Sequence, residues 1–292
     1  MQIQWYPGHM TKTRRKMAEL IKQVDAVCEV IDARIPAASR NPDLPNIARQ
    51  KPRLMILNRI DLADPIYTAQ WKAYFQNQGM AVIETDSRSG QGTQAFSSAV
   101  RSLLSDKIAR WNEQGQTGRA VRVMIAGIPN VGKSTFINRI LGRKSAKAAD
   151  KPGVTRGSQW FRVEKGIELL DTPGILWHKF DDPNVGQLLA MTGAIKDDIL
   201  DVETLACRLM ERLAEQAPEA IINRYRLVIP EENDFLGYDL LQQAGKQRGF
   251  LQRGGEIDTE RMARILLDEF RGGVLGRITL EHIVTSPEDV SS

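Results

Sequence analysis

Eight residues in the middle of the chain constrain its fold more than any other feature. Residues 127–134 read GIPNVGKS and match the phosphate-loop pattern G-x-x-x-x-G-K-[ST] at every fixed position. They follow the apolar run VRVMIA at 121–126 and precede a helix-like segment at 133–141, which is the context that the pattern requires. The glycines let backbone N–H groups turn inward around a phosphate, and the helix N-terminus adds a partial positive charge. We therefore expect an α/β domain that binds a phosphate-bearing ligand.

Several side chains in and after this loop have predicted roles. Lys133 is expected to reach the β- and γ-phosphates, and the Ser134 hydroxyl is expected to ligate Mg²⁺. Asp171 follows the apolar run 167–170, where a carboxylate beside the phosphate loop is placed to hold Mg²⁺ through water. Thr155 lies between the two motifs and is a candidate second hydroxyl ligand. The other predicted nucleotide contacts of these loops are Asn130, Val131, Gly132, Thr135 and, at the γ-phosphate, the N–H of Gly174.

Two further loops are candidates for recognising the base. Residues 58–61 read NRID and follow the apolar run 54–57. The Asp61 carboxylate would accept hydrogen bonds from N1–H and N2–H₂ of guanine, which adenine does not offer. Asn58 would bond the base edge and tie this loop to the phosphate loop, while Arg59 stands where a lysine is usual and Ile60 completes the motif. After the run 81–83, a backbone N–H near Asp86 and Ser87 would meet guanine O6.

The rest of the first 178 residues alternates short apolar runs with helix-like segments. Strands are predicted at 26–31, 54–57, 81–83, 121–126, 159–163 and 167–170, and helices at 10–24, 65–78, 93–111 and 133–141. This alternation favours βαβ units and a mostly parallel sheet with flanking helices. After residue 178 the apolar spacing is helical, with 227–229 as the main β-rich exception. We therefore predict a nucleotide-binding domain at 1–178 and a small, mostly helical domain at 179–292.

Charge is distributed unevenly between these two parts. Residues 1–178 carry 27 Lys and Arg against 15 Asp and Glu, whereas residues 179–292 carry 13 against 21. Such an excess favours a polyanionic partner, with a solvated basic face as the alternative. No stretch approaches the roughly 18 apolar residues of a membrane span, so no membrane partner is expected. Cys28 and Cys207 lie in apolar surroundings without metal-ligand spacing, which favours inert core thiols and a reducing cytoplasm.

The order of the nucleotide motifs is permuted. The base loops precede the phosphate loop, so the usual five motifs occur in the order 4-5-1-2-3. Further motifs accompany this order, namely WYPGHM at 5–10, DARIP at 32–36, SRNP at 39–42, FRGG at 270–273 and LGR at 275–277. With these motifs the chain resembles the circularly permuted GTPases of ribosome assembly, the YlqF type, over nearly its whole length.

This resemblance implies a function and partners. It implies Mg²⁺-dependent GTP hydrolysis in late assembly of the large ribosomal subunit, with nucleotide-dependent binding to rRNA, a C-terminal domain that touches the rRNA, and activation by the subunit. We expect a cytoplasmic monomer. The basic residues of the first predicted helix are then candidate rRNA phosphate contacts, with a solvated face as the alternative; they are Lys12, Arg14, Arg15, Lys16 and Lys22.

The group that orients the attacking water is less evident. Ile175 follows Gly174, where many GTPases place a glutamine. The resemblance implies that His9 takes this role, and His178 is a second candidate because of its proximity to the loop. Asn130 stands where an asparagine can help hold K⁺ near the phosphates, with turn geometry as the alternative.

Two other functions remain open on the sequence. An ATP-using phosphate-loop enzyme is one, and Asn58 and Asp61 argue against it. A nucleotide-gated RNA-binding module with negligible turnover is the other, and the apolar Ile175 keeps it open.

Overall fold

The computed structural model describes residues 10–48, 50–142, 159–164, 166–174, 182–230 and 236–283. These residues divide into two compact units. The first unit contains 10–60, 65–174 and 281–283, and the second contains 61–64 and 182–280. The boundary predicted at 178/179 lies outside the described residues. Every helix in the described part of the chain is too short or too polar to cross a lipid bilayer.

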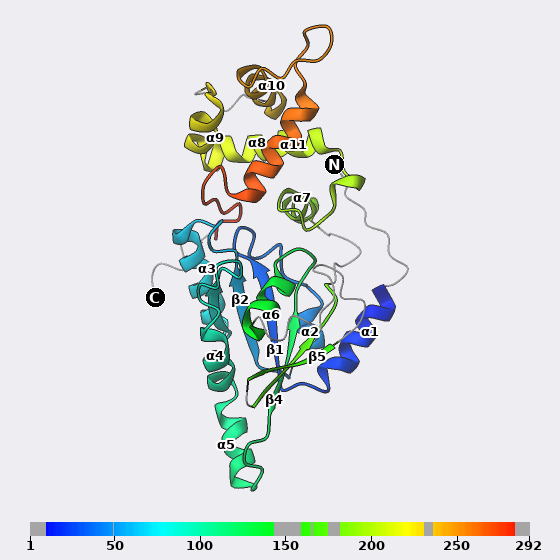
Figure 1. Ribbon diagram of the computed structural model, residues 1–292, viewed down its shortest axis with the longest axis vertical. Helices are drawn as coiled ribbons and strands as arrows, with labels where there is room; N and C mark the ends of the chain where they lie inside the picture. Colours follow the sequence, from blue (N-terminus) through cyan, green and yellow to red (C-terminus); the bar gives the residue numbers. More distant parts are fainter. Residues whose placement is uncertain are drawn as a thin grey trace. The chain divides into compact units, whose positions relative to one another are not determined.

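One six-stranded sheet organises the first unit, with the strand order β3-β2-β1-β4-β6-β5 (Figure 1). The strands are β1 Ala26–Asp32, β2 Arg53–Asn58, β3 Ala81–Thr85, β4 Val121–Ala126, β5 Gln159–Glu164 and β6 Ile167–Asp171. Only β5 runs antiparallel to its neighbour, so the predicted mostly parallel sheet is confirmed. β1 is buried along its whole length, as expected for a parallel strand that is covered on both faces. The carboxyl ends of β1, β2, β3 and β4 therefore meet at one edge.

Helices cover the sheet. They are α1 Met10–Ile21, α2 Leu44–Ile47, α3 Pro65–Asn77, α4 Ala95–Leu103, α5 Ser105–Glu113 and α6 Lys133–Leu141. Met17 and Ile21 of α1 pack with α2 onto Met124 of β4, and Figure 1 shows α6 in front of the strands. The single helix predicted at 93–111 is instead two helices, because the backbone leaves helical geometry at Leu104. The four-residue α2 is too short to show a helical period in the sequence.

The second unit is helical, as predicted. It contains α7 Pro183–Met191, α8 Val202–Gln216, α9 Pro218–Tyr225, α10 Gly237–Gln247 and α11 Thr259–Gly272, and a 3₁₀ turn at Asp197–Ile199. α10 approaches α8 so closely that a Cβ on Gly237 would lie 2.1 Å from the carbonyl oxygen of Cys207. The β-rich run 227–229 does not form a strand, because the described part of this unit offers no strand beside it.

The two cysteines differ in their surroundings. Cys28 is buried in β1, as predicted, and burial raises the pKa of its thiol. Cys207 is only half-buried, so it is not the core residue that the sequence predicted. Partial burial and nearby acidic residues, Glu203 first among them, raise the pKa of the Cys207 thiol to about 11. Both thiols therefore stay protonated and poorly nucleophilic at neutral pH.

In each unit, hydrogen bonds join chain segments that are distant in sequence. In the second unit, the N–H of Ile278 donates to the Leu62 oxygen at 2.9 Å, and the Arg277 Nε donates to the Ala63 oxygen at 2.8 Å. The chain then returns to the first unit, where the Glu281 carboxylate accepts from the Ala37 N–H at 2.7 Å. His282, which the sequence placed in the second domain, stacks on Tyr67 of α3 with ring centroids 3.8 Å apart.

The FRGG motif has a structural role in the second unit. Arg271 donates to the carbonyl oxygens of Met191 at 3.1 Å and Ala190 at 2.9 Å, which lie at the end of α7. Its guanidinium also forms two hydrogen bonds of 2.7 Å with the Asp197 carboxylate. Gly273 ends α11 in a left-handed conformation with φ of 76°.

We predict that Arg271→Ala lowers the free energy of unfolding by about 2–4 kcal/mol, because it removes charged hydrogen bonds from the end of α7. Arg271→Lys should have an intermediate effect, since an ammonium cannot form the same planar, forked contacts. Urea unfolding followed by circular dichroism measures both variants. The control is Arg264→Ala, which removes an exposed i,i+4 pair with Glu260 and should leave the midpoint unchanged. Equal effects of the Arg271 and Arg264 variants would contradict the assignment.

Candidate functional site

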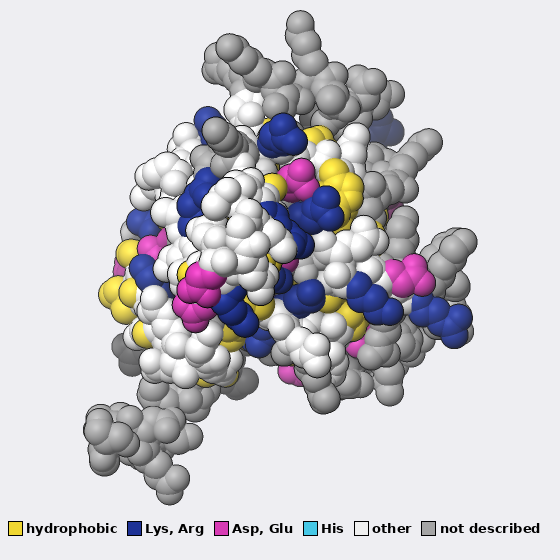
Figure 2. All heavy atoms as spheres, turned by 90° about the horizontal axis from the view of Figure 1, so that it is seen from below, with side chains coloured by type: hydrophobic (Ala, Val, Ile, Leu, Met, Phe, Trp, Pro, Cys, Tyr) yellow, Lys and Arg dark blue, Asp and Glu magenta, His cyan; other side chains and the backbone are white. Residues whose placement is uncertain are grey.

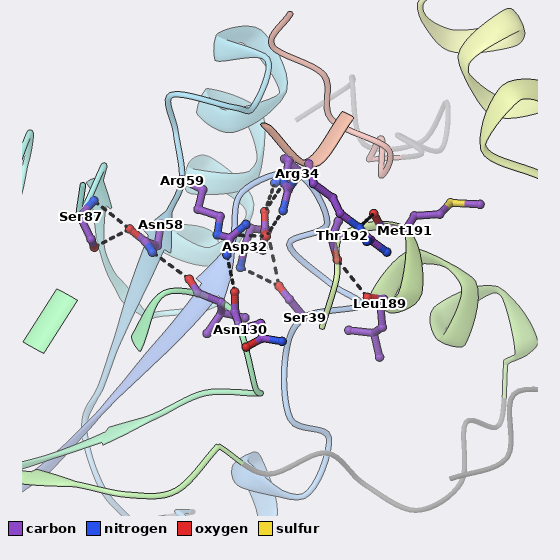
Figure 3. A network of polar contacts seen from close by, with 12 residues as sticks. Asp32, Arg34, Ser39, Asn58, Arg59, Ser87, Asn130, Leu189, Met191 and Thr192 are labelled. Atoms are coloured by element: carbon purple, nitrogen blue, oxygen red, sulfur yellow. Dashed lines mark hydrogen bonds and ion pairs between the residues drawn. The ribbon is translucent and has the colours of Figure 1, made fainter. Parts of the chain in front are cut away.

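Three loops converge at the carboxyl edge of the sheet around one buried side chain, Asn58 (Figure 3). Its amide nitrogen donates to the Val131 oxygen of the phosphate loop at 2.8 Å. Its amide oxygen accepts from the Thr85 hydroxyl at 3.1 Å and from the N–H and hydroxyl of Ser87 at 3.2 and 2.6 Å. The predicted tie between the loop at 58–61 and the phosphate loop is therefore present, and it also includes the loop after β3. The amide nitrogen carries a second hydrogen that a ligand can receive.

The phosphate loop needs its glycines for steric reasons. Gly132 has φ of 91°, and a Cβ there would lie 2.3 Å from the amide nitrogen of Asn58. A Cβ on Gly127 would lie 2.7 Å from the carbonyl oxygen of Val30. Both distances are shorter than van der Waals contact, so only glycine allows the loop to approach β1 and β2 this closely. The loop therefore has the backbone cradle that the sequence pattern requires.

Lys133 and Asp171 meet beneath this loop. The Lys133 ammonium forms a short ion pair with the Asp171 carboxylate, and both side chains are buried. Ser134 lies next to Lys133 in the first turn of α6 and is half-buried. The Thr172 hydroxyl donates to the Ile125 oxygen at 2.8 Å, which fixes the chain after β6 against β4. Gly174 lies close to the phosphate loop, since a Cβ on it would be 3.0 Å from the Pro129 nitrogen.

Two side chains with oxygen ligands suitable for Mg²⁺ adjoin Lys133: Ser134 follows it in the chain, and Asp171 pairs with it. A hydroxyl from Ser134 and a carboxylate from Asp171 are the hard donors that Mg²⁺ prefers, and this ion ordinarily completes its shell with water and substrate phosphates. In the described residues no group of three or more His, Cys, Asp or Glu side chains could hold a metal without such a substrate.

Arg59 connects the loop after β2 to the phosphate loop. Its guanidinium donates to the Asn130 carbonyl oxygen, and its Nε lies 3.7 Å from the Asp32 carboxylate (Figure 3). Both Arg59 and Asn130 have left-handed backbone conformations, with φ of 64° and 61°. The arginine thus occupies a defined place between two loops, although it replaces the usual lysine.

Asp32 and Arg34 were not assigned a role from the sequence, although their motif was noted. Arg34 is fully buried and donates to both Asp32 carboxylate oxygens, at 3.0 and 2.7 Å. Burial raises the pKa of Asp32, but the charge and hydrogen bonds of Arg34 and the charge of Arg59 outweigh it, so this pKa lies below its usual value. The Ser39 hydroxyl accepts from the Asp32 N–H at 2.9 Å. Asp32 is therefore ionised at neutral pH, and its carboxylate pairs with both Arg34 and Arg59.

The loop after β3 is organised by its own hydrogen bonds. The Asp86 carboxylate accepts from the N–H groups of Arg88 at 2.8 Å and Ser89 at 3.2 Å, and the Asp86 N–H donates to Gln91 at 3.0 Å. The Ser87 N–H already donates to Asn58. An N–H of this loop that donated to a guanine base would therefore share its hydrogen between the base and its partner in the protein. Arg139 of α6, which the sequence did not single out, donates to the carbonyl oxygens of Ser87 at 3.2 Å and of Arg88.

Of the remaining predicted residues, some lie in the described part of the chain and others lie outside it. Ile60 and Val131 have buried side chains, whereas Asp61, Asn130 and Thr135 are exposed. His9, Thr155 and His178 lie outside the described residues, as does Ile175.

Comparisons with known proteins agree with this site. Residues 122–224 match the family described as 50S ribosome-binding GTPase. A Bacillus cereus protein named ribosome biogenesis GTPase A is 45% identical over 282 residues, which is 96% of this chain and 94% of that protein. A Thermotoga maritima protein of the same name is 31% identical, over 99% of this chain and 96% of that protein.

Solved structures show the same similarity. A GDP-bound YlqF structure matches with a TM-score of 0.68 and 28% identity, covering 94% of this chain and 100% of that chain. A GNP-bound YlqF structure from T. maritima matches with a TM-score of 0.62 and 27% identity, covering 93% of this chain and 98% of that chain. The chain therefore belongs to the circularly permuted YlqF-type GTPases, the family of the proteins named ribosome biogenesis GTPase A, and it hydrolyses GTP.

Proposed function

We propose that this ribosome biogenesis GTPase acts in late assembly of the large ribosomal subunit, that it binds the subunit's rRNA in a nucleotide-dependent way, and that the subunit activates hydrolysis. One observation carries the proposal. The base loop at 58–61 runs from the first unit into 61–64 of the second unit, and the loop after Asp171 also leads along the chain into that unit, from 182 onward. Both the base side and the γ-phosphate side of the site are thus covalently continuous with the second unit.

This continuity supports coupling between nucleotide and partner. If the γ-phosphate draws the loop around Gly174 toward itself, the conformation of the chain segment that leads into the second unit would also change. Order–disorder switches act in this way in other GTPases. The description of the matched family, 50S ribosome-binding GTPase, favours the large subunit as the partner. We expect the chain to act as a monomer in the cytoplasm, where bacterial ribosomes assemble.

In this proposal the phosphates are bound by Lys133 and by backbone groups of Asn130, Val131, Gly132, Thr135 and Gly174. Lys133 exchanges its contact with Asp171 for the phosphate oxygens. Ser134, Asp171 and Thr155 hold Mg²⁺, with Asp171 acting through water. The ion supplies positive charge that offsets the charge developing on the phosphates.

The guanine base is bound at the other side of the cradle. Asp61 accepts from its two N–H donors, and Asn58 donates its second amide hydrogen to the base edge. Arg59 and Ile60 hold the loop in place. Asp86 and Ser87 form the wall opposite, where a backbone N–H approaches O6.

Water is oriented by a group outside the described residues. Ile175 is apolar and cannot orient it, so we assign the role to His9, with the subunit placing it over the γ-phosphate. The exposed Asn130 side chain offers an amide oxygen to K⁺, whose charge would stabilise the transition state in place of an arginine finger.

Co-sedimentation tests the proposed function. The full chain is mixed with purified large or small ribosomal subunits in GDP or in a non-hydrolysable GTP analogue. We expect pelleting with large subunits, stronger with the analogue than with GDP, and a faster GTP turnover when large subunits are present. Lys133→Ala, which removes a direct phosphate contact, should abolish the nucleotide dependence. Equal pelleting with small subunits, or none with large ones, would refute the proposal.

We predict that Asn58→Ala lowers GTP and GDP affinity at least roughly tenfold and the free energy of unfolding by about 2–4 kcal/mol. The reason is that buried donors from Thr85 and Ser87 and the acceptor on Val131 lose their partner. Isothermal titration with nucleotide and urea unfolding measure the two effects. Asn77→Ala, at the exposed end of α3, is the matched control and should change neither quantity.

Asp61→Asn should shift base preference from guanine toward xanthine nucleotides by roughly 10- to 100-fold, because an amide donor suits the xanthine C2 carbonyl where the carboxylate suited N2–H₂. Competition between GTP and XTP for binding measures the shift. Asp64→Asn, three residues later, should leave the preference unchanged. If Asp61→Asn still prefers GTP as strongly as the parent chain, residues 58–61 are not the base loop.

His9→Ala should lower subunit-stimulated hydrolysis by roughly 10²–10⁴-fold, the range for a well-placed acid, base or orienting group, and leave GTP affinity nearly intact. Single-turnover hydrolysis with large subunits and equilibrium GTP binding provide the pair of measurements. His282→Ala, which removes the stack on Tyr67, is the control and should keep the stimulated rate. An unchanged rate in His9→Ala would assign the orienting group to the ribosome instead.

A further inference from the structure

Cationic and aromatic side chains form a continuous set of contacts that leads from α5 across the start of β4 to the edge strand β5. The Arg119 guanidinium lies 4.3 Å from the ring centroid of Trp111, and the Lys107 ammonium lies 5.3 Å from it. Lys107 also pairs with Asp25 at 2.6 Å, directly before β1. The Asp25 carboxylate accepts from the N–H of Arg122, the next cation, at 2.8 Å. These contacts lead without interruption from α5 to the start of β4.

The same sequence of contacts continues onto the edge strand β5. The Arg122 guanidinium lies 5.3 Å from the ring centroid of Trp160 and pairs with Glu168 at 2.9 Å. Arg162 lies 3.9 Å from the same carboxylate. Arg122, Glu168 and Arg162 are in register across β4, β6 and β5, so their side chains stand on one face of the sheet. We call this set the basic–aromatic row: Arg119, Trp111, Lys107, Arg122, Trp160 and Arg162.

The outer part of the row is open to solvent. Trp160 is 40% exposed, and the side chains of Arg122 and Arg162 are 54% and 78% exposed. One exposed aromatic ring is ordinary on a protein surface. Here, however, an arginine lies over the ring and a second arginine stands two residues further along the same strand. The partly exposed ring therefore lies beside cations.

The row itself carries more cations than carboxylates. Three of its four cations contact two carboxylates, Asp25 and Glu168, and Arg110 of α5 adds an exposed cation beside the exposed acidic residues Asp106 and Glu113. Figure 2 views this end of the molecule and shows Lys and Arg side chains spread over it, with fewer Asp and Glu among them. The excess of positive charge in residues 1–178 therefore includes the cations of the row.

We propose that the basic–aromatic row binds a single-stranded segment of RNA, with Trp160 as the platform for one base and Arg119, Arg122 and Arg162 facing the phosphates. The proposal rests on the proposed function, since it adds a second RNA contact to a ribosome-assembly GTPase. Aromatic rings bind unpaired bases by stacking whatever their sequence, and arginine combines stacking with forked phosphate contacts. Bases in an RNA duplex are not available for such stacking, which favours a loop or single strand.

Fluorescence anisotropy with a fluorescein-labelled 12-nucleotide single-stranded RNA tests the platform, using the full chain saturated with GDP. Trp160→Ala should raise the Kd roughly 5- to 150-fold, the range for loss of one stacked base, and Trp160→Phe should restore most of the affinity. Tyr74→Ala, which truncates another 40%-exposed aromatic residue, should leave the Kd unchanged. No loss in Trp160→Ala, or an equal loss in Trp160→Phe, would overturn the proposal.

Salt dependence tests the phosphate contacts. Arg162→Ala should reduce the slope of log affinity against log salt by about 0.7, as expected for one phosphate of a single strand. Lys72→Ala, which removes a cation paired with Glu84 on another part of the unit, should keep the slope. All variants should hydrolyse GTP like the parent chain, because none of the substituted side chains is assigned a contact with the nucleotide or Mg²⁺.

Subunit co-sedimentation of the same variants separates this inference from the proposed function. If the parent chain does not pellet with large subunits but the oligonucleotide results hold, the proposed function fails and the RNA surface stands. If Trp160→Ala and Arg162→Ala lose subunit binding but keep the oligonucleotide affinity, the row contacts a ribosomal protein and the RNA proposal is overturned.

Discussion

The buried carboxamide of Asn58 is the contact on which the nucleotide site depends. Its oxygen accepts three hydrogen bonds and its nitrogen donates one, which joins the ends of β2 and β3 to the phosphate loop. An aspartate would lose the donor, and an apolar residue would leave several buried polar groups without a partner. The steric requirement at Gly132 follows from the same contact, because its Cα faces the amide nitrogen of Asn58.

In this circularly permuted chain, the loop that begins at Asn58 continues directly into the second unit. The junction belongs to the first unit, yet the chain passes from Ile60 directly into 61–64, which bonds to Arg277 and Ile278 of the second unit. The base loop is thus anchored on one side by Asn58 and on the other by the second unit. Arg59 and the Asp32–Arg34 pair add charged contacts on the first-unit side.

The two units also use their charges differently. In the second unit, Arg224 and Arg248 pair with Glu269, and Arg271 pairs with Asp197, so these arginines stabilise the packing of helices. In the first unit, the cations of the basic–aromatic row outnumber the carboxylates they contact and remain largely exposed. The split in net charge along the sequence therefore has a physical counterpart: the basic half has cations available for a polyanion, as we propose for RNA.

The sequence by itself determined the α/β class, the six strands, the phosphate loop and the permuted order of motifs. These features depend on local patterns, namely apolar runs of strand length, helical spacing and glycines at fixed offsets. The tie from Asn58 to the phosphate loop was also predictable, since its motif implies that geometry. Only the tertiary structure decided the roles of Asp32, Arg34 and Arg139, the return of His282 to α3, and the row around Trp160. These depend on which strands become neighbours and on which side chains share a face, and Tyr67 and His282, which stack, are 215 positions apart in the sequence. No local pattern carries that information.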